Sequence, residues 1–326
     1  MKRTILAFLL LAASALILNA QEIRTNYRSG SKSHISTDYE EITCGECPLW
    51  TRIEKVGYSD GSSIYILYLN FEQKVATSVP KGVKMAFNLP NGSMVRADQI
   101  GQDSATKKSF TRGNSKVYWN RTKYALDEAD MKKISRGISS IDVITGWNPE
   151  DYIQMSFPGD ELASLFRRHM EAIDKASAST VNLKAELSGR ANNRNNILTT
   201  AKAISARGDN YAYNVTLTHL YYKNANKEDF DLKIQIGARG KHHIAIDSPI
   251  TFTLANGSSL VLKQAIDEDD IFTVYPSIRE LRLLCGGIKA ITIEYEGGKL
   301  TDSFSSNALS SAINQQYQLL MSVSDR

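Results

Sequence analysis

An internal repeat constrains the fold of this chain more than any other feature of its sequence. The stretch FNLPNGSMV at residues 87–95 returns as FTLANGSSL at residues 252–260, and the same offset aligns YILYLNF with FDLKIQI. Two later blocks, MKKISRGISSIDVI with LRLLCGGIKAITIE and GDELASLFRRHMEAI with SNALSSAINQQYQLL, follow in the same order. A period of roughly 150 residues predicts two related domains rather than a solenoid of short repeats.

The residue pattern of each copy predicts its elements. Apolar residues that alternate along the chain predict half-buried strands, and Asn91-Gly92 and Asn256-Gly257 predict hairpin tips, because Asn-Gly adopts the positive φ of tight turns. A short helix is expected over 127–136 and over 277–285, ended by a left-handed glycine. An amphipathic helix closes each copy. The fold class is therefore α+β: two tandem related domains, each a mainly antiparallel sheet with two helices on one face.

The N-terminus predicts export. A basic start and a run of about fifteen apolar residues are typical of a secretory signal peptide over residues 1–20, and they are too short for a comfortable membrane span. The mature chain then divides into a polar segment over 21–48 (a loose tail or an added edge strand), repeat one over 49–174, a partly helical linker over 175–208 and repeat two over 209–326. We expect a periplasmic or secreted protein without a membrane span.

The charge balance excludes one class of partner. Of 39 basic residues, 37 remain once Lys2 and Arg3 are removed, against 35 acidic residues. A net charge of +2 gives no general attraction to polyanions, so nucleic acid is not an expected partner.

The copies differ most before the short helix, where copy one has an insertion over 101–123 and copy two has only 266–274. The insertion is rich in basic and aromatic residues, which are the candidate binding residues: Lys107, Lys108, Phe110, Arg112, Lys116, Tyr118, Trp119, Arg121 and Lys123. Three interpretations stay open. The insertion is a solvated surface loop, or a site where cations and ring faces bind an anion or a glycan. In the third, it docks on the acidic stretch 267–270 within or between molecules.

Other motifs are weaker. The acidic stretch 267–270 lacks the spacing of an EF-hand calcium loop, and His242 and His243 would point to opposite faces of a strand. No metal site and no cofactor are therefore expected. The triplet DSA at residues 103–105 resembles the acceptor motif of a bacterial O-glycosylation system, which makes Ser104 a candidate glycosylation site.

The CGEC motif formed by Cys44 and Cys47 resembles the redox site of the thioredoxin family. In that family the first cysteine opens a helix, whereas here a strand-like alternation follows Pro48. A small disulfide formed on export is the preferred interpretation, and Cys285 is expected as a buried free thiol.

No motif of the common hydrolase, zinc-protease or phosphate-binding classes is present. The sequence therefore predicts an exported, non-catalytic binding or interaction protein of the cell envelope or extracellular space. Its expected partner is an unknown protein or an anionic glycan, and self-association of the basic and acidic stretches is a further option. The alternative function is an envelope thiol–disulfide oxidoreductase that uses Cys44 and Cys47.

Overall fold

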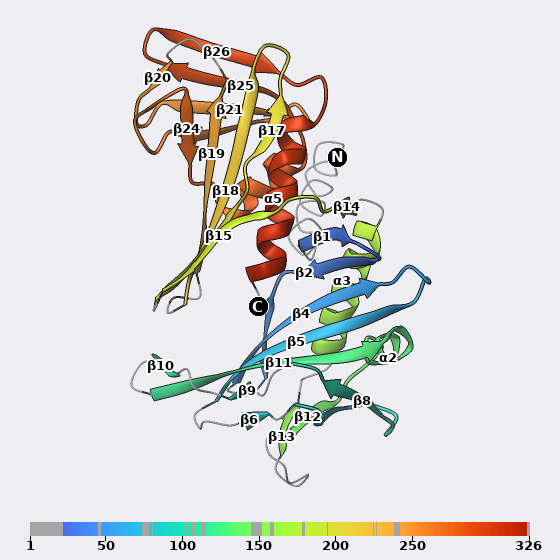
Figure 1. Ribbon diagram of the computed structural model, residues 1–326. Coiled ribbons are helices and arrows are strands. Elements are labelled where there is room, and N and C mark those ends of the chain that lie inside the picture. Colours follow the sequence, from blue (N-terminus) through green and yellow to red (C-terminus); the bar gives the residue numbers. More distant parts are fainter. Residues whose placement is uncertain are drawn as a thin grey trace, which may run out of the picture. The chain divides into compact units, whose positions relative to one another are not determined.

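The computed structural model describes residues 22–44, 47–73, 78–79, 81–101, 104–105, 109–112, 115–144, 152–156, 160–177, 180–193, 195–223, 225, 227–237 and 242–324. These residues form a sheet-rich α+β structure with mainly antiparallel sheets and four helices (Figure 1). The chain divides into two compact units, Met1–Val181 and Asn182–Arg326, which we describe separately.

The first unit is built on one long sheet. Its strands are β1 (Ile23–Ser29), β2 (Lys32–Thr37), β3 (Glu40–Cys44), β4 (Cys47–Gly57), β5 (Ser63–Gln73), β6 (Ser78–Val79), β7 (Lys84–Asn88), β8 (Met94–Gln99), β9 (Ser104–Ala105), β10 (Ser109–Arg112), β11 (Ser115–Asp127), β12 (Ser140–Ile144) and β13 (Tyr152–Ser156), with β14 (Val181–Asn182) at the unit boundary. The sheet order is β13-β12-β7-β8-β11-β5-β4-β2-β1; β10 pairs with β11, β3 with β4, and β6 with β9. Two helices complete the unit, α2 (Glu128–Ile134) and α3 (Glu161–Ala176).

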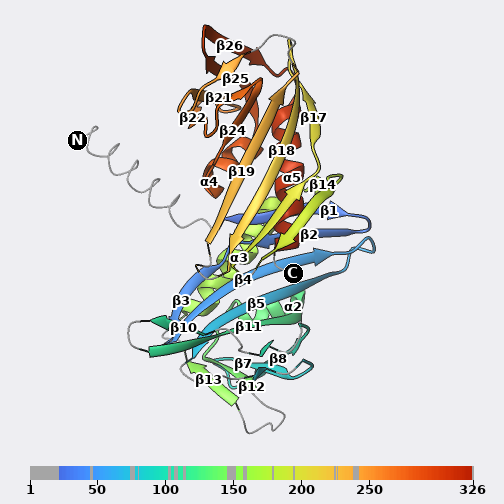
Figure 2. The same ribbon diagram turned by 60° about the vertical axis from the view of Figure 1, so that its left-hand side comes forward.

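The second unit divides its strands among smaller sheets. They are β15 (Leu187–Asn192), β16 (Asn196–Ala201), β17 (Ile204–Arg207), β18 (Ala212–Tyr222), β19 (Lys227–Ile236), β20 (His243–Ile244), β21 (Pro249–Leu254), β22 (Ser259–Lys263), β23 (Glu268–Asp269), β24 (Ile271–Val274), β25 (Ile288–Tyr295) and β26 (Gly298–Ser303). One sheet has the order β15-β16-β18-β19-β24 with β17 on β18, another is β22-β21-β25-β26, and β20 pairs with β23. The helices are α4 (Ile278–Cys285) and α5 (Ala308–Ser324), and α5 runs alongside β18 (Figures 1 and 2).

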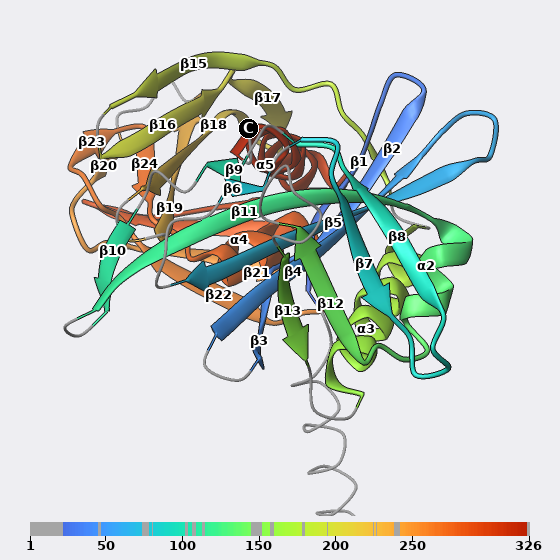
Figure 3. The same ribbon diagram turned by 90° about the horizontal axis from the view of Figure 1, so that it is seen from below.

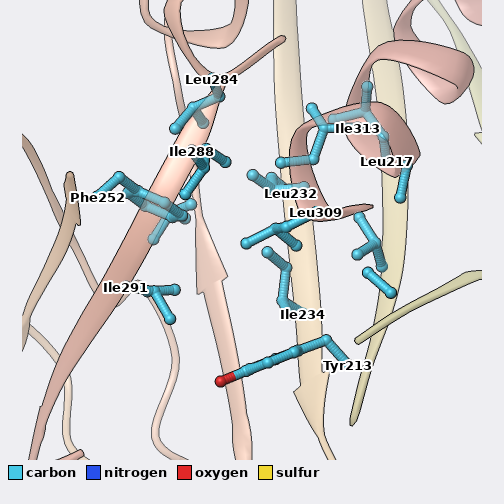
Figure 4. Packing of buried hydrophobic residues seen from close by; sticks show 14 of the residues in the cluster. Tyr213, Leu217, Leu232, Ile234, Phe252, Leu284, Ile288, Ile291, Leu309 and Ile313 are labelled. Atoms are coloured by element: carbon cyan, nitrogen blue, oxygen red, sulfur yellow. The ribbon is translucent and has the colours of Figure 1, made fainter. Parts of the chain in front are cut away.

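Each unit buries its own apolar core. In the first unit, β5 alternates buried Tyr65, Leu67, Leu69 and Phe71 with residues of the other face, and both helices add buried side chains to the same cluster. In the second unit, residues from β18, β19, β21 and β25 meet those of α4 and α5 (Figure 4). Each buried large apolar side chain contributes about 1.5–3 kcal/mol, so packing rather than local propensity holds the helices on the sheets.

The two Asn-Gly hairpin tips are present, but their turn differs from the expected one. Only the glycines have positive φ, 80° at Gly92 and 86° at Gly257. The Asn91 side chain accepts hydrogen bonds from the Ser93 amide at 3.0 Å and hydroxyl at 2.7 Å, and Asn256 does the same with Ser258. The loops therefore have three residues and end in a left-handed glycine, which is the second common hairpin geometry.

The glycine after the short helix has a different role from the one expected. Gly287 has a φ of 135°, but Gly137 does not have a positive φ. A Cβ atom on Gly137 would lie 3.1 Å from Pro90 Cγ, and one on Gly287 would lie 2.8 Å from Ala255 Cβ. Pro90 and Ala255 occupy the same position of the two hairpin tips, so in both units the glycine lets the helix end approach the hairpin closely.

The segments over 175–208 and 21–48 form strands. The stretch expected as a partly helical linker carries β15, β16 and β17, because one face of β16 is buried, with Thr199 2% and Ala201 0% exposed, while β15 is exposed along its whole length. The polar N-terminal segment, expected as a loose tail or an added edge strand, forms three strands: β2 and β1 extend the sheet beyond β4, and β3 pairs with β4. The expected signal peptide lies outside the described residues. Among the described helices, none has the length and apolar character needed to cross a membrane.

Candidate functional site

Most of the described residues of the insertion lie in strands. Ser109–Arg112 of β10 pairs with residues 115–118 of β11, and residues 118–127 of β11 pair with β5. Figure 3 shows β11 as one long strand with β10 beside one end and α2 at the other. We call β10 together with residues 115–123 the basic arm. The corresponding strand of the second unit, β24, has only 4 residues.

The structure divides the candidate binding residues. Lys107 and Lys108 lie outside the described residues, and only the backbone is described for Ser104, Phe110, Arg112, Lys116 and Trp119. Among the remaining three, Tyr118 shares a strand face with the fully buried Asn120, while Arg121 and Lys123 lie on the opposite face. The described candidates therefore do not form one patch. Arg121, which is exposed, and Lys123, which is half-buried, mark the face of the sheet that is turned away from the core.

A ladder of two cations and a tyrosine crosses this face. Lys123 on β11, Tyr68 on β5 and Arg52 on β4 are register partners on three adjacent strands. The Lys123 Nζ lies 4.8 Å from the centre of the Tyr68 ring, and the Arg52 Cζ lies 3.8 Å from it. The ring of Tyr39 lies 5.3 Å from the same guanidinium. These are cation–π distances, so the aromatic rings hold both positive charges in fixed positions.

Glu54 fixes the orientation of the central ring. It accepts a hydrogen bond from the Tyr68 hydroxyl at 2.6 Å, and its other oxygen lies 2.9 Å from His34 Nδ1. Burial alone would raise the pKa of Glu54, but the hydrogen bonds to His34 and Tyr68 and the charge of Arg52 lower it below its ordinary value. The ionised carboxylate therefore anchors Tyr68 between the two cations.

Sequence reasoning missed Arg52, Glu54 and Tyr68, although a signal was present. In the strand YILYLNF, Tyr68 lies on the face opposite to the apolar series, so its ring does not belong to the core alternation. An aromatic side chain at such a position indicates a second packed or binding face. Arg52 is only 2% exposed, so its charge supports the ladder from within. Lys123 of the ladder and Arg121, two residues away on the same strand face, are the more accessible cations.

The acidic stretch of the second unit is engaged locally. Glu268 pairs with Lys233 at 2.9 Å, Asp269 with His243 at 3.0 Å and Asp270 with His242 at 2.9 Å, and Asp267 accepts a hydrogen bond from the Ile246 amide. The two histidines thus go to different acids. Within the described part of the chain, no cluster of three or more histidine, cysteine or acidic side chains has an arrangement that could hold a metal ion.

The cysteine pair lies on a hairpin and not at the start of a helix. Cys44 ends β3, Cys47 begins β4, and the two are register partners. Opposite residues of antiparallel strands have Cα atoms about 4.5–5.5 Å apart, a separation that a disulfide can bridge. The side chains of both lie outside the described part of the structure, so the disulfide stays a prediction. Cys285 is a free thiol, and burial raises its pKa above the ordinary value.

Comparison with known proteins adds no family. No protein-family model matches the chain, and a search of curated proteins finds no significant match.

Proposed function

We propose that the mature chain is an exported, non-catalytic binding protein of the cell envelope or extracellular space, and that the basic arm binds an anionic glycan. The observation that carries this proposal is the Lys123–Tyr68–Arg52 ladder, in which the cations of Lys123 and Arg52 lie over the Tyr68 ring across three strands. An acidic sugar offers carboxylates for the accessible cations, while the buried Tyr68 ring holds Lys123 in position.

We further propose that the two units are tandem related domains, each a mainly antiparallel sheet with two helices on one face. Support comes from strand order, since β13-β12-β7-β8 in the first unit corresponds to β26-β25-β21-β22 in the second. The shared Asn–Ser hydrogen bonds at the hairpin tips and the shared close approach of a glycine to each tip support it further. A duplicated scaffold with an arm on one copy suits a protein that presents a binding surface.

The chemistry of the arm favours a ligand held by charge. Arg121 is exposed, and Lys123 is partly accessible beside the Tyr68 ring. Contacts of this kind weaken when salt screens them, because the Debye length falls from about 10 Å at 0.1 M salt to about 3 Å at 1 M. Binding of an uncharged glycan would show no such dependence.

The test is calorimetric titration of the mature protein with polygalacturonate, a polyuronate, and with neutral dextran. We expect salt-sensitive binding of polygalacturonate, weakened several-fold by Arg121→Ala and by Lys123→Ala. Lys202→Ala is the matched control, because Lys202 is an exposed lysine of the second unit that pairs with Glu186. Absence of wild-type binding, or equal binding by both arm variants and the control, would refute the glycan proposal.

Self-association is the competing outcome. If the basic insertion over residues 101–123 docks on the acidic stretch of another molecule, Lys107→Glu with Lys108→Glu should shift the oligomeric state in a salt-dependent way. The local pairing of Glu268, Asp269 and Asp270 does not favour this outcome, because those carboxylates already have partners. Analytical ultracentrifugation of the mature chain at low and high salt distinguishes it from glycan binding.

A further inference from the structure

A buried histidine joins α3 to the sheet of the first unit. His169 is 0% exposed, and its Nδ1 lies 2.6 Å from the Thr37 Oγ1. The same hydroxyl accepts from the Ile53 amide at 3.2 Å and lies 3.3 Å from the Ile53 carbonyl oxygen. The other ring nitrogen, Nε2, is buried and has no hydrogen-bond partner among the described residues. The imidazole is therefore held at one nitrogen only.

The second unit has a glutamine at the same place. The alignment that pairs Leu162 with Leu309 and Phe166 with Ile313 pairs His169 with Gln316. Gln316 is also 0% exposed, and its Nε2 donates to the Lys202 carbonyl at 3.1 Å and the Val215 carbonyl at 2.7 Å. Its Oε1, like His169 Nε2, is buried and has no partner within the described part of the chain. The units thus share a buried polar link from the last helix to the sheet, and they differ because an imidazole titrates and an amide does not.

A second residue of α3 contacts the same part of the first unit. Arg168, the neighbour of His169, forms an ion pair with Glu40. Thr37 ends β2 and Glu40 begins β3. His169 and Arg168, two adjacent residues of α3, therefore contact the two ends of the connection between these strands. Tyr39 lies within that connection, with its ring over Arg52. A shift of α3 would therefore also move Tyr39 and its ring contact with Arg52. In this region α3 packs against β1, β2 and β4 (Figure 1).

We propose that His169 is an acid-sensitive clasp, whose protonation releases α3 from the β2–β3 connection of the first unit while the second unit stays closed. An imidazolium has two N–H donors. Among the described residues, only Nδ1 has an acceptor in the closed structure, so a charge on the ring would be buried with one donor unsatisfied, which is strongly unfavourable. Protonation of His169 therefore opposes closure.

The electrostatic surroundings agree with this geometry. Burial, and then the neighbouring Arg168, lower the pKa of His169 from 6.5 to about 3. Charged groups on the strands packed against α3 have partners of their own: Arg24 with Asp38, His34 with Glu54, and Lys55 with Asp174, while Arg52 stacks on tyrosines. Because the closed-state pKa is depressed, the opened form binds more protons. Closure is fully stable above about pH 6.5 and weakens as the pH falls toward 3.

The test replaces His169 by glutamine, the residue at the equivalent position of the second unit. Wild type and His169→Gln are compared by hydrogen–deuterium exchange at about pH 7.5 and about pH 4.5. The control is His243→Gln, which changes a partly exposed histidine of the second unit. After correction for intrinsic exchange, we expect acid to speed exchange of peptides covering 37–44 and 161–173 by tenfold or more, relative to α5. His169→Gln should abolish the increase, and His243→Gln should retain it.

An unchanged acid response in His169→Gln would overturn the proposal, as would equal acid-induced exchange in α5. If His169→Gln does not fold, a titration of the histidine ring signals of the wild-type protein by NMR decides the question. One ring must stay neutral well below pH 6.5 until the first unit opens, and ordinary titration of all described histidines would overturn the proposal. No ligand enters these measurements, so their outcome is independent of the glycan proposal.

Discussion

At the scale of single residues, Gln264 is a buried side chain that no sequence pattern singles out. It is 2% exposed and lies between the end of β22 and β24. Its Oε1 accepts from the Thr273 amide at 2.8 Å, and its Nε2 donates to the Ile271 carbonyl at 3.2 Å. In the first unit, the residue at the same position of the repeat is Gln99, where β8 and β11 pair directly. In the second unit, the buried side-chain amide of Gln264 thus links the sheets that contain β22 and β24. In the first unit, β8 and β11 belong to one continuous sheet.

We expect Gln264→Leu to lower the free energy of unfolding of the second unit by about 1–3 kcal/mol, because it leaves the buried Thr273 amide without an acceptor. Urea unfolding followed by circular dichroism measures the change. Gln235→Leu is the control, since Gln235 is exposed on β19. Equal stability of the two variants would show that Gln264 does not join the sheets.

The ladder shows why residue-scale features escape sequence reasoning. The basic and aromatic residues of the arm were found from composition, but their division between two faces depends on strand pairing. Tyr68 and Arg52 come from other strands, and only the register of β4, β5 and β11 brings them to Lys123. Contacts between residues far apart in the chain leave no local pattern.

At the scale of elements, local signals located the helices well. The short helices begin after Asp127 and Ser277, whose side chains accept from the amides of Asp130 and Glu280, and α4 has a complete capping box. A surface loop was one of the interpretations of the insertion, because the sequence shows no clear apolar alternation there. The polar residues Asn120 and Thr122 occupy buried positions of β11, so the alternation that marks a half-buried strand is hidden.

The β3–β4 hairpin provides a test of the cysteine pair. The chain has three cysteines, and we expect the protein exported by its own signal to show one reactive thiol in denaturant and almost none when native. A disulfide between Cys44 and Cys47 removes two thiols, and burial raises the pKa of the Cys285 thiol, which slows its reaction. Titration with a chromogenic thiol reagent, with and without denaturant, measures both values.

Three reactive thiols in denaturant would rule out the structural disulfide. The oxidoreductase alternative requires more, namely disulfide-reductase activity that is lost in Cys44→Ser with Cys47→Ser while circular dichroism stays unchanged. A variant that is less stable but has no activity to lose supports the structural disulfide. Cys285→Ser serves as the control in both assays.

At the scale of the whole molecule, each unit draws its core from its own residues. The core cluster of the second unit is built between Ala201 and Met321, and that of the first between Ile35 and Ile173. The repeat in the sequence predicts two related domains, because duplicated alternation and turn residues are local patterns. The beginning of the second unit was less visible, because the exposed β15 and half-exposed β16 resemble a polar linker.

We expect residues 182–326 alone to fold and to unfold cooperatively, whereas residues 209–326 should be less stable by several kcal/mol. The shorter fragment lacks β15, β16 and β17, and with them the buried Ala201 and Ala206 and the Lys202 carbonyl that accepts from Gln316. Urea unfolding of both fragments, followed by circular dichroism, makes the comparison. Equal stability would show that the three strands add nothing to the core and would favour a boundary near residue 209.

The join between β11 and α2 has a mechanical consequence. Asp127 is at once the last residue of β11 and the N-cap of α2, so no flexible connection separates the basic arm from the helix. A pull on the outer end of the arm is therefore borne first by the hydrogen bonds that pair β11 with β5 over residues 118–127. If those bonds give way, no slack chain protects the first turn of α2, and the hydrogen bond from the Asp130 amide to Asp127 takes the load next.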